Sequence, residues 1–199
     1  MEFTLIIYQG MMKMKTKKGF TLIELLLTIS IISILSSLAF ASFSNIISQH
    51  QGYTAISKLL LAVNLSRNQS ISSASITTLC PSENNLKCAG KWEKDLTLFI
   101  DHNGNRKVDP NDKIIRKFSP MPNGSKLFWR SFQNKQYLQF APSGYTRNQN
   151  GTFTYCSPSK KLVQAKMLIV NRAGRPRVAQ DTDNDGIPNS PSGAMPNCT

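Results

Sequence analysis

Two arginines spaced two residues apart form the segment of this chain best suited to binding an anion. They lie in Gly174-Arg175-Pro176-Arg177, and Arg172 is just upstream. Residues two apart in an extended segment point to the same side, so Arg175 and Arg177 are expected to form a paired fork. Guanidinium groups bind phosphate through two parallel hydrogen bonds. The pattern indicates a phosphate-binding site, to which the preceding hairpin adds Lys160, Lys161 and Lys166.

The same arginines have a structural alternative, because charged side chains also protect an exposed edge strand from aggregation. The chain has 24 basic and 11 acidic residues and a formal net charge of +13. Such a surplus favours a polyanionic partner, such as nucleic acid or anionic lipid headgroups, or serves solubility. Pro176 ends or edges a strand because it lacks a backbone N–H, and we expect it to lift the segment out of the sheet into the tail.

Three aspartates downstream resemble the start of a calcium loop. Asp181, Asp183 and Asp185 alternate along the chain, and Gly186 follows at the sixth place, where a calcium loop turns sharply. The twelfth position is Ser192, so a complete EF-hand is excluded. A looser calcium turn stays open, and without a metal the same carboxylates would repel phosphate.

The sequence predicts no enzyme. His50 is expected in a helix and His102 in a turn, and neither has a nucleophile or carboxylate partner at a catalytic spacing. Residues 101–112 space oxygen atoms at alternate positions, but Arg106 occupies the sixth place, which favours a hairpin loop over a calcium site. Stacking on bases is one use for aromatic residues of the strands, although such residues more often form a core: Phe128, Trp129, Phe132 and Tyr137.

A lone carboxylate interrupts a long apolar stretch near the N-terminus. Glu24 is the only ionisable side chain in residues 20–43. As a helix, this stretch would cover roughly 36 Å, enough to span a bilayer. A carboxylate inside such a span is costly and marks a functional site. The end that stays in the cytoplasm is set by four preceding lysines: Lys13, Lys15, Lys17 and Lys18.

The segment KKGFTLIE, residues 17–24, resembles the processing site of type IV pilins and pseudopilins. The resemblance implies that prepilin peptidase cleaves between Gly19 and Phe20, that Phe20 is N-methylated and that residues 1–19 are a leader. It also implies that Glu24 meets the new N-terminal amine, its own or a neighbour's, during filament assembly. The alternative is a plain signal anchor with a chance glutamate. The start codon stays open among Met1, Met11, Met12 and Met14.

Behind the apolar stretch, hydrophobic residues recur at helical spacing through residues 44–77. We expect one helix over about residues 20–75, with residues 20–43 in the membrane or filament core and residues 44–77 packed on a sheet. Residues 78–178 form the β region, followed by an extended tail, residues 179–199, held only by Cys198. Turn residues separate about six predicted antiparallel strands, which gives an α+β fold: 96–100, 113–118, 126–132, 137–140, 152–156 and 165–170.

All four cysteines lie beyond the apolar stretch. An even number in an exported domain predicts two disulfides. Three pairings exist, and we favour Cys80–Cys88, which closes a tight loop, and Cys156–Cys198, which pins the tail to the sheet. Zinc is the competing interpretation, but the spacings fit no common zinc pattern and neither histidine is nearby.

Several motifs of the β region resemble the GspH/FimT family of minor pilins and pseudopilins. The resemblance covers about residues 17–178 and implies the type IV pilin-like fold, in which a long N-terminal helix packs on an antiparallel sheet. The motifs occur in this order: residues 79–82, Cys88, Trp92, 98–101, 103–105, Asp109, 114–116, 140–144, 151–153, Cys156 and 174–177.

The resemblance implies a minor type IV pilin that is anchored once in the inner membrane, with its C-terminal domain in the periplasm, and then joins a pilus at the cell surface. Its partners would be other pilins or pseudopilins, and prepilin peptidase. Family members with a GRxR motif are linked to DNA capture in natural transformation, which extends double-stranded DNA binding to Arg175 and Arg177. The alternatives are a GspH-like pseudopilin of a type II secretion system and an adhesin for another polyanion. No cofactor is expected, apart from calcium at Asp181, Asp183 and Asp185.

Overall fold

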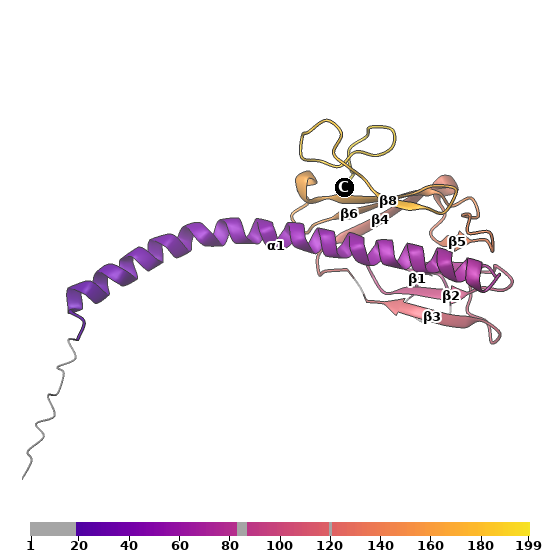
Figure 1. Ribbon diagram of the computed structural model, residues 1–199, viewed down its shortest axis with the longest axis horizontal. Coiled ribbons are helices and arrows are strands. Elements are labelled where there is room, and N and C mark those ends of the chain that lie inside the picture. Colours follow the sequence, from indigo (N-terminus) through magenta and orange to yellow (C-terminus); the bar gives the residue numbers. More distant parts are fainter. Residues whose placement is uncertain (1–18, 83–86, 120) are drawn as a thin grey trace, which may run out of the picture. The chain divides into compact units, whose positions relative to one another are not determined.

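The computed structural model describes residues 19–82, 87–119 and 121–199, without the side chains of residues 38–42. The predicted leader lies outside these residues, except for Gly19. The chain divides into two compact units, Met1–Phe43 and Ser44–Thr199. The helix α1, Leu22–Ser72, contributes to both (Figure 1). It is slightly shorter than the predicted helix of residues 20–75.

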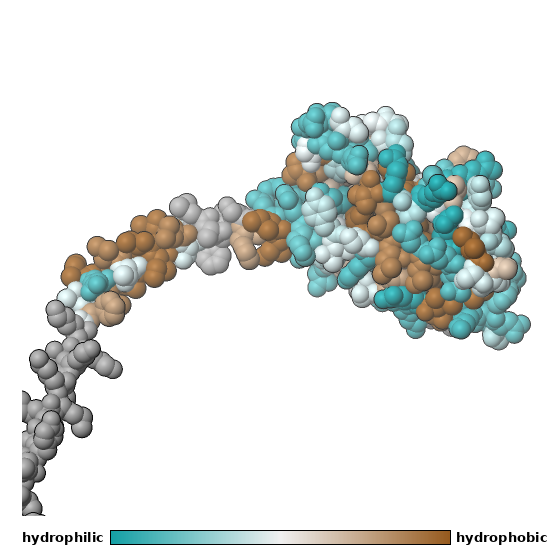
Figure 2. Space-filling view, in the orientation of Figure 1, coloured by the Kyte–Doolittle hydropathy of each residue, from teal (hydrophilic) through white to brown (hydrophobic). Residues whose placement is uncertain are grey.

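In the N-terminal unit, α1 begins after Thr21, whose hydroxyl accepts a hydrogen bond from the Glu24 backbone N–H at 3.3 Å. The hydroxyls of Ser30, Ser33 and Ser36 donate to carbonyls one turn earlier, so they are satisfied within the helix. Figure 2 shows the hydrophobic surface of this segment. The exposed side chains include Leu22, Ile23, Leu25, Leu26, Leu27, Ile29, Ile31, Ile32, Ile34 and Leu35.

The predicted membrane span of residues 20–43 falls partly outside the described side chains, which stop at residue 37 and resume at residue 43. Within the described part of the chain, no helix combines the length and the apolar character needed to cross a membrane.

The C-terminal unit contains two four-stranded antiparallel sheets, which appear on either side of α1 in the view of Figure 1. The first sheet has the order β3 (Lys113–Phe118), β2 (Leu96–Ile100), β1 (Thr77–Pro81), β5 (Leu138–Phe140). The second has the order β4 (Lys126–Ser131), β6 (Gly151–Cys156), β7 (Lys166–Val170), β8 (Pro176–Val178). Short 3-10 helices follow β4 and precede β7: Phe132–Asn134 and Leu162–Gln164. The α+β fold agrees with the prediction.

One hydrophobic core joins the helix to both sheets. On α1, Ile56, Leu59 and Val63 are buried at helical spacing. Burying each such side chain contributes about 1.5–3 kcal/mol relative to exposure. Aromatic rings complete the core, with Phe153 stacked on Trp129 at 3.9 Å between centroids. Side chains alternate along the strands of the second sheet. One face of this sheet therefore packs against α1, and the opposite face is its outer face.

Two strands, β1 and β8, are absent from the predicted set. The structure corrects the prediction that Pro176 lifts its segment out of the sheet, because Pro176 pairs with Val170 and begins edge strand β8. An edge strand tolerates proline since one side of its backbone has no partner strand. Strand β8 has only three residues, which is too short to give a clear alternating pattern in the sequence.

The tail is also better anchored than predicted. In addition to the disulfide of Cys198, two residues hold the tail. The Ala179 backbone N–H donates to the Met167 carbonyl at 2.9 Å, and Asn189 is buried. The Asn189 side chain accepts hydrogen bonds from the backbone and hydroxyl of Thr182. The structure contains the disulfides Cys80–Cys88 and Cys156–Cys198, the two pairs favoured from the sequence.

Candidate functional site

The predicted arginine fork lies on the tight hairpin between β7 and β8. Asn171 closes the hairpin, since its side-chain oxygen accepts the Arg175 backbone N–H at 2.9 Å and its carbonyl accepts the Gly174 N–H at 3.0 Å. Gly174 has φ +75°, a conformation that side chains rarely adopt. Arg172 and Arg175 are both exposed on this hairpin. The backbone that carries the arginines is thus fixed by local hydrogen bonds.

The hairpin is also wedged against the turn that follows β5. A Cβ atom added to Gly174 would lie 2.2 Å from the Gly144 carbonyl oxygen, so the two turns are in direct contact. The Thr146 backbone and hydroxyl both donate to the Arg172 carbonyl, at 3.0 and 3.2 Å. We call the surface formed by Arg172, Arg175 and Arg177 the arginine hairpin. It is anchored to the sheet on one side and to the β5–β6 connection on the other.

Strand register gives the direction of Arg177. It pairs with Ile169, which pairs with Thr152, which in turn pairs with Arg130. Directly paired residues of an antiparallel sheet share a face. Ile169 lies in a small cluster separate from the main core, so this row is on the outer face. Arg177 and Arg130 are therefore exposed at opposite ends of one row across the sheet.

The three predicted lysines do not join the arginines. Lys166 is on the inner face at the far end of β7, where its ammonium lies 4.5 Å from the centre of the Tyr53 ring. Lys160 and Lys161 directly precede the 3-10 helix at the same end. Strand β7 alone spans about 13 Å at 3.3 Å per residue. The predicted six-residue patch is therefore two separate groups.

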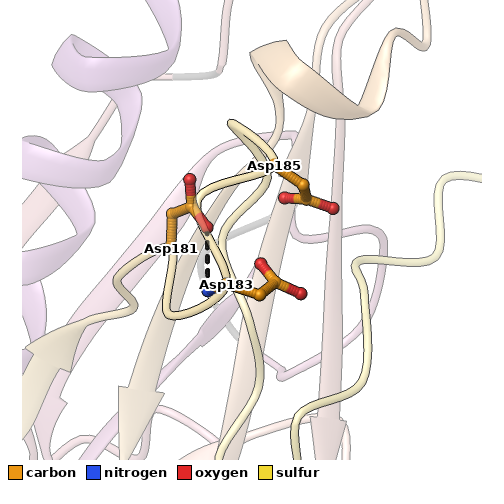
Figure 3. A group of neighbouring side chains, drawn as sticks. All are labelled: Asp181, Asp183 and Asp185. Carbon is orange, nitrogen blue, oxygen red and sulfur yellow. Dashed lines mark hydrogen bonds between the residues drawn. The ribbon is translucent and has the colours of Figure 1, made fainter.

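The turn that carries Asp181, Asp183 and Asp185, which we call the acidic turn, lies at the same end of β7 as Lys160 and Lys161. Gly186 faces Val163 of the 3-10 helix, with 3.9 Å between an added Cβ and a Val163 methyl. Figure 3 shows the carboxylates of Asp181, Asp183 and Asp185 on this turn, all exposed, with one oxygen of each within 4.8 Å of the others. The negative charge is thus at the end of β7 where Lys160 and Lys161 lie, and not at the end that carries the arginine hairpin.

The turn is closed by its own hydrogen bonds. Asp181 accepts the backbone N–H groups of Asp183, Asn184 and Gly186. Burial raises the pKa of Asp181, but these backbone bonds and a side-chain bond with Asp183 lower it overall, below its ordinary value. Calcium takes six to eight oxygen ligands. The three carboxylates supply part of such a set, with carbonyls or water needed for the rest, and calcium binding stays a prediction.

Arginines that sequence reasoning missed lie near the hairpin. Arg147 follows Thr146, whose backbone bonds to the Arg172 carbonyl. Arg67, on the last turns of α1, has its Nε 3.3 Å from where a Cβ of Gly144 would lie. Both are far from Arg175 in sequence, and no motif marks them. Within the described residues, no ion pair involves any of these arginines.

The N-terminal processing residues are exposed. Gly19 and Phe20 precede α1, and the Phe20 side chain is 85% exposed. Glu24 lies in the first turn of α1. Both sides of the predicted cleavage site are thus accessible, although Gly19 and Phe20 as a cleavage pair, and the role of Glu24, stay predictions.

Comparison with known protein families identifies the family of this chain. A model described as the type II transport protein GspH matches residues 55–174, more than half of the chain. The chain belongs to the GspH family. A second model, the prokaryotic N-terminal methylation motif, matches residues 14–40. No curated protein sequence matches the chain.

Two solved crystal structures share the fold of this GspH family member. Two crystal forms of the Pseudomonas aeruginosa type IV minor pilin FimU, in space groups P21 and P65, are each 16% identical to it. The first has a TM-score of 0.53 and covers 66% of this chain and 90% of FimU, and the second has 0.50 and covers 64% and 92%. The minor pseudopilin EpsH of the Vibrio cholerae type 2 secretion system is 13% identical, with a TM-score of 0.47, and covers 64% of this chain and 95% of EpsH.

The chain is thus a minor pilin or pseudopilin of the GspH/FimT type, as predicted. Proteins of this kind are structural subunits that assemble with other pilins, and prepilin peptidase processes their N-terminal motif. They form surface pili or pseudopili after membrane insertion. Membership of a family of structural subunits also confirms that the chain is not an enzyme.

Proposed function

We propose that this protein is a minor type IV pilin that takes part in pilus assembly and binds extracellular double-stranded DNA, without sequence preference, for natural transformation. The observation that carries the proposal is the arginine hairpin: Arg172, Arg175 and Arg177 are exposed, set on a fixed backbone and free of ion pairs within the described residues. Neutralising phosphates with such side chains releases counterions, which drives sequence-independent binding.

The distribution of charge supports DNA over simple protection of the edge strand. Protection needs charge only along β8, whereas Arg172 and Arg175 lie on the turn that precedes it. The acidic turn is at the other end of β7, next to Val163, so its carboxylates do not oppose phosphate at the hairpin. For the same reason, we assign Lys160, Lys161 and Lys166 a minor part in DNA binding.

The proposal keeps the predicted N-terminal chemistry. Cleavage between Gly19 and Phe20 and methylation of Phe20 would prepare a subunit anchored once in the inner membrane, with its C-terminal domain in the periplasm. Glu24 would then meet the N-terminal amine of its own or a neighbouring subunit during entry into the filament. The match of residues 14–40 to the methylation motif supports this sequence of events.

The second candidate is a GspH-like pseudopilin, a structural subunit of a type II secretion system. The family match to residues 55–174 favours it as much as the pilin. A pseudopilin has no need of a DNA-binding surface, so the arginine hairpin separates the two candidates.

The test is the affinity of the full chain, in neutral detergent, for a blunt DNA duplex at fixed salt. The variant Arg175→Ala/Arg177→Ala is compared with the matched control Lys160→Ala/Lys161→Ala, which removes the same charge at the other end of the domain. We expect the arginine variant to lose most binding and the lysine control to lose little. Equal losses would reduce the arginines to general surface charge, and a wild type that binds no duplex would favour the pseudopilin.

A further inference from the structure

An exposed tyrosine lies on the segment that is tied to the arginine hairpin. Tyr145 ends the turn after β5, and its side chain is 55% exposed while its neighbours Gly144 and Thr146 are buried. Within the described residues, its hydroxyl makes no hydrogen bond and its ring meets no other ring or cation. Arg147, two residues on, is exposed as well. The Arg147 guanidinium lies against Gly104, close to where a Cβ of that glycine would be.

The backbone beneath Tyr145 is held on three sides. The Tyr145 carbonyl accepts the Ala141 N–H at 2.9 Å, and the Gly144 N–H donates to the Ala141 carbonyl at 2.8 Å. Gly144 has φ +77°, and an added Cβ there would lie 2.8 Å from the Ile71 Cδ1 atom of α1. The bonds from Thr146 to the Arg172 carbonyl then tie the segment to the hairpin. The backbone that carries the ring is thus held next to the arginine hairpin.

An exposed ring next to a basic hairpin suits a nucleotide whose base is not paired. Bases stack on aromatic side chains in proteins that bind single strands, while cationic groups hold the backbone phosphates. Inside a duplex, the base faces are covered by their neighbours, so only ends and single-stranded segments offer a free face. The hairpin alone binds phosphates of either form.

We propose that Tyr145 is a stacking platform for an unpaired DNA base, so that this surface prefers DNA with single-stranded ends over a blunt duplex. The inference rests on the proposed DNA binding of the arginine hairpin and adds the class of DNA that is bound most tightly.

The test compares the full chain, in neutral detergent, on a blunt duplex and on the same duplex with a short single-stranded overhang. We expect wild type to prefer the overhang by about tenfold, within the range of single-base stacking. Tyr145→Ala should lose this preference and keep its blunt-duplex affinity, while Tyr145→Phe should keep the preference because it retains the ring. Phe132→Ala is the matched control, since Phe132 is 57% exposed at the end of the opposite edge strand, β4, and should leave the preference unchanged.

Failure of this inference is distinguishable from failure of the proposed function. If wild type binds both probes equally, or if Tyr145→Ala keeps the preference, stacking on Tyr145 is wrong while arginine-dependent duplex binding can still hold. If Tyr145→Ala weakens both probes equally, the ring supports the surface rather than an unpaired base, which also overturns the inference. If wild type binds neither probe, both proposals are wrong.

Discussion

Asp101 illustrates why residues with oxygen atoms spaced as in a calcium loop need not bind a metal ion. Its carboxylate is fully buried and accepts hydrogen bonds from the Thr78 hydroxyl at 2.7 Å and the Gln139 amide at 3.1 Å. The backbone N–H groups of Asn105 and Arg106 also donate to it, each at 3.0 Å. The alternating oxygens of residues 101–112 are thus used to close a loop, in agreement with the predicted hairpin.

Asp112, at the end of this loop, should make stability depend on pH. Burial raises the pKa of Asp112, but hydrogen bonds from the backbone of Asp109 and His102, together with the His102 ring, lower it overall below its ordinary value. A carboxylate with a lowered pKa stabilises the folded protein at pH values above its ordinary pKa of about 3.9. This contribution is lost as the pH falls through the folded-state pKa. Asp112→Asn should therefore be less stable than wild type at neutral pH, with the difference narrowing in acid.

The measurement is denaturant unfolding of both proteins across acidic and neutral pH. Asp95→Asn is the control, because Asp95 is exposed and its side chain makes no hydrogen bond within the described residues. It should follow the wild-type profile. A difference between Asp112→Asn and wild type that stays constant with pH would contradict the assigned role of the carboxylate.

The exposure of individual side chains was easier to predict from the sequence than their tertiary contacts. Arg175 and Arg177 are both exposed, as expected of charged side chains at a turn and an edge strand, and their pairing as a fork stays a prediction. Lys166 was misplaced, since the contact with Tyr53 that holds it against α1 depends on tertiary packing. Arg147 and Tyr145 were missed because the contact between their segment and the hairpin joins parts of the chain that are distant in sequence.

At the scale of elements, Gly174 tests how the β7–β8 hairpin is docked. Gly174→Ala meets two costs: the positive φ and the collision with the Gly144 carbonyl. Gly193 is a matched control, because its φ is +80° but no atom lies within 4 Å of an added Cβ. We expect Gly193→Ala to lower the free energy of unfolding by about 1–2 kcal/mol, the cost of the conformation alone. Gly174→Ala should lose clearly more in urea unfolding, and equal losses would show that the two turns are not in close contact.

The two disulfides should differ in their effect on stability. The Cys80–Cys88 pair closes a separation of 8 residues and the Cys156–Cys198 pair one of 42. In the chain-entropy model, a longer loop restricts the unfolded chain more, giving about 2.5 and about 4 kcal/mol respectively. Paired Cys→Ala variants compared by denaturant unfolding should show this order. The reverse order would mean that local contacts, rather than loop closure, decide the loss.

The long, periodic helix and most strands of the second sheet were predictable, because each carries a strong repeating pattern. Strand β8 was not, since it has three residues and begins with Pro176. The tail looked extended because its composition is polar. Its anchors, Ala179 and Asn189, bond to Met167 and to residues within the tail, and no local pattern marks those bonds.

For the whole molecule, the role of Glu24 predicts a separation of insertion from assembly. Glu24→Ala removes the one ionisable side chain of residues 20–43, so membrane insertion should be retained or improved. Incorporation into filaments should be lost, because the N-terminal amine would lack its partner. The measurement is the amount of subunit in sheared pili against the membrane fraction. Normal incorporation of Glu24→Ala would contradict the role.

Charge is divided between the two ends of the second sheet, with the arginine hairpin at one end of β7 and the acidic turn at the other. The most direct test of DNA capture is the salt dependence of duplex binding by the full chain. We predict that removing the two side chains in Arg175→Ala/Arg177→Ala makes the slope of log affinity against log salt shallower by about 1–2. An unchanged slope would contradict the claim that these arginines contact phosphate.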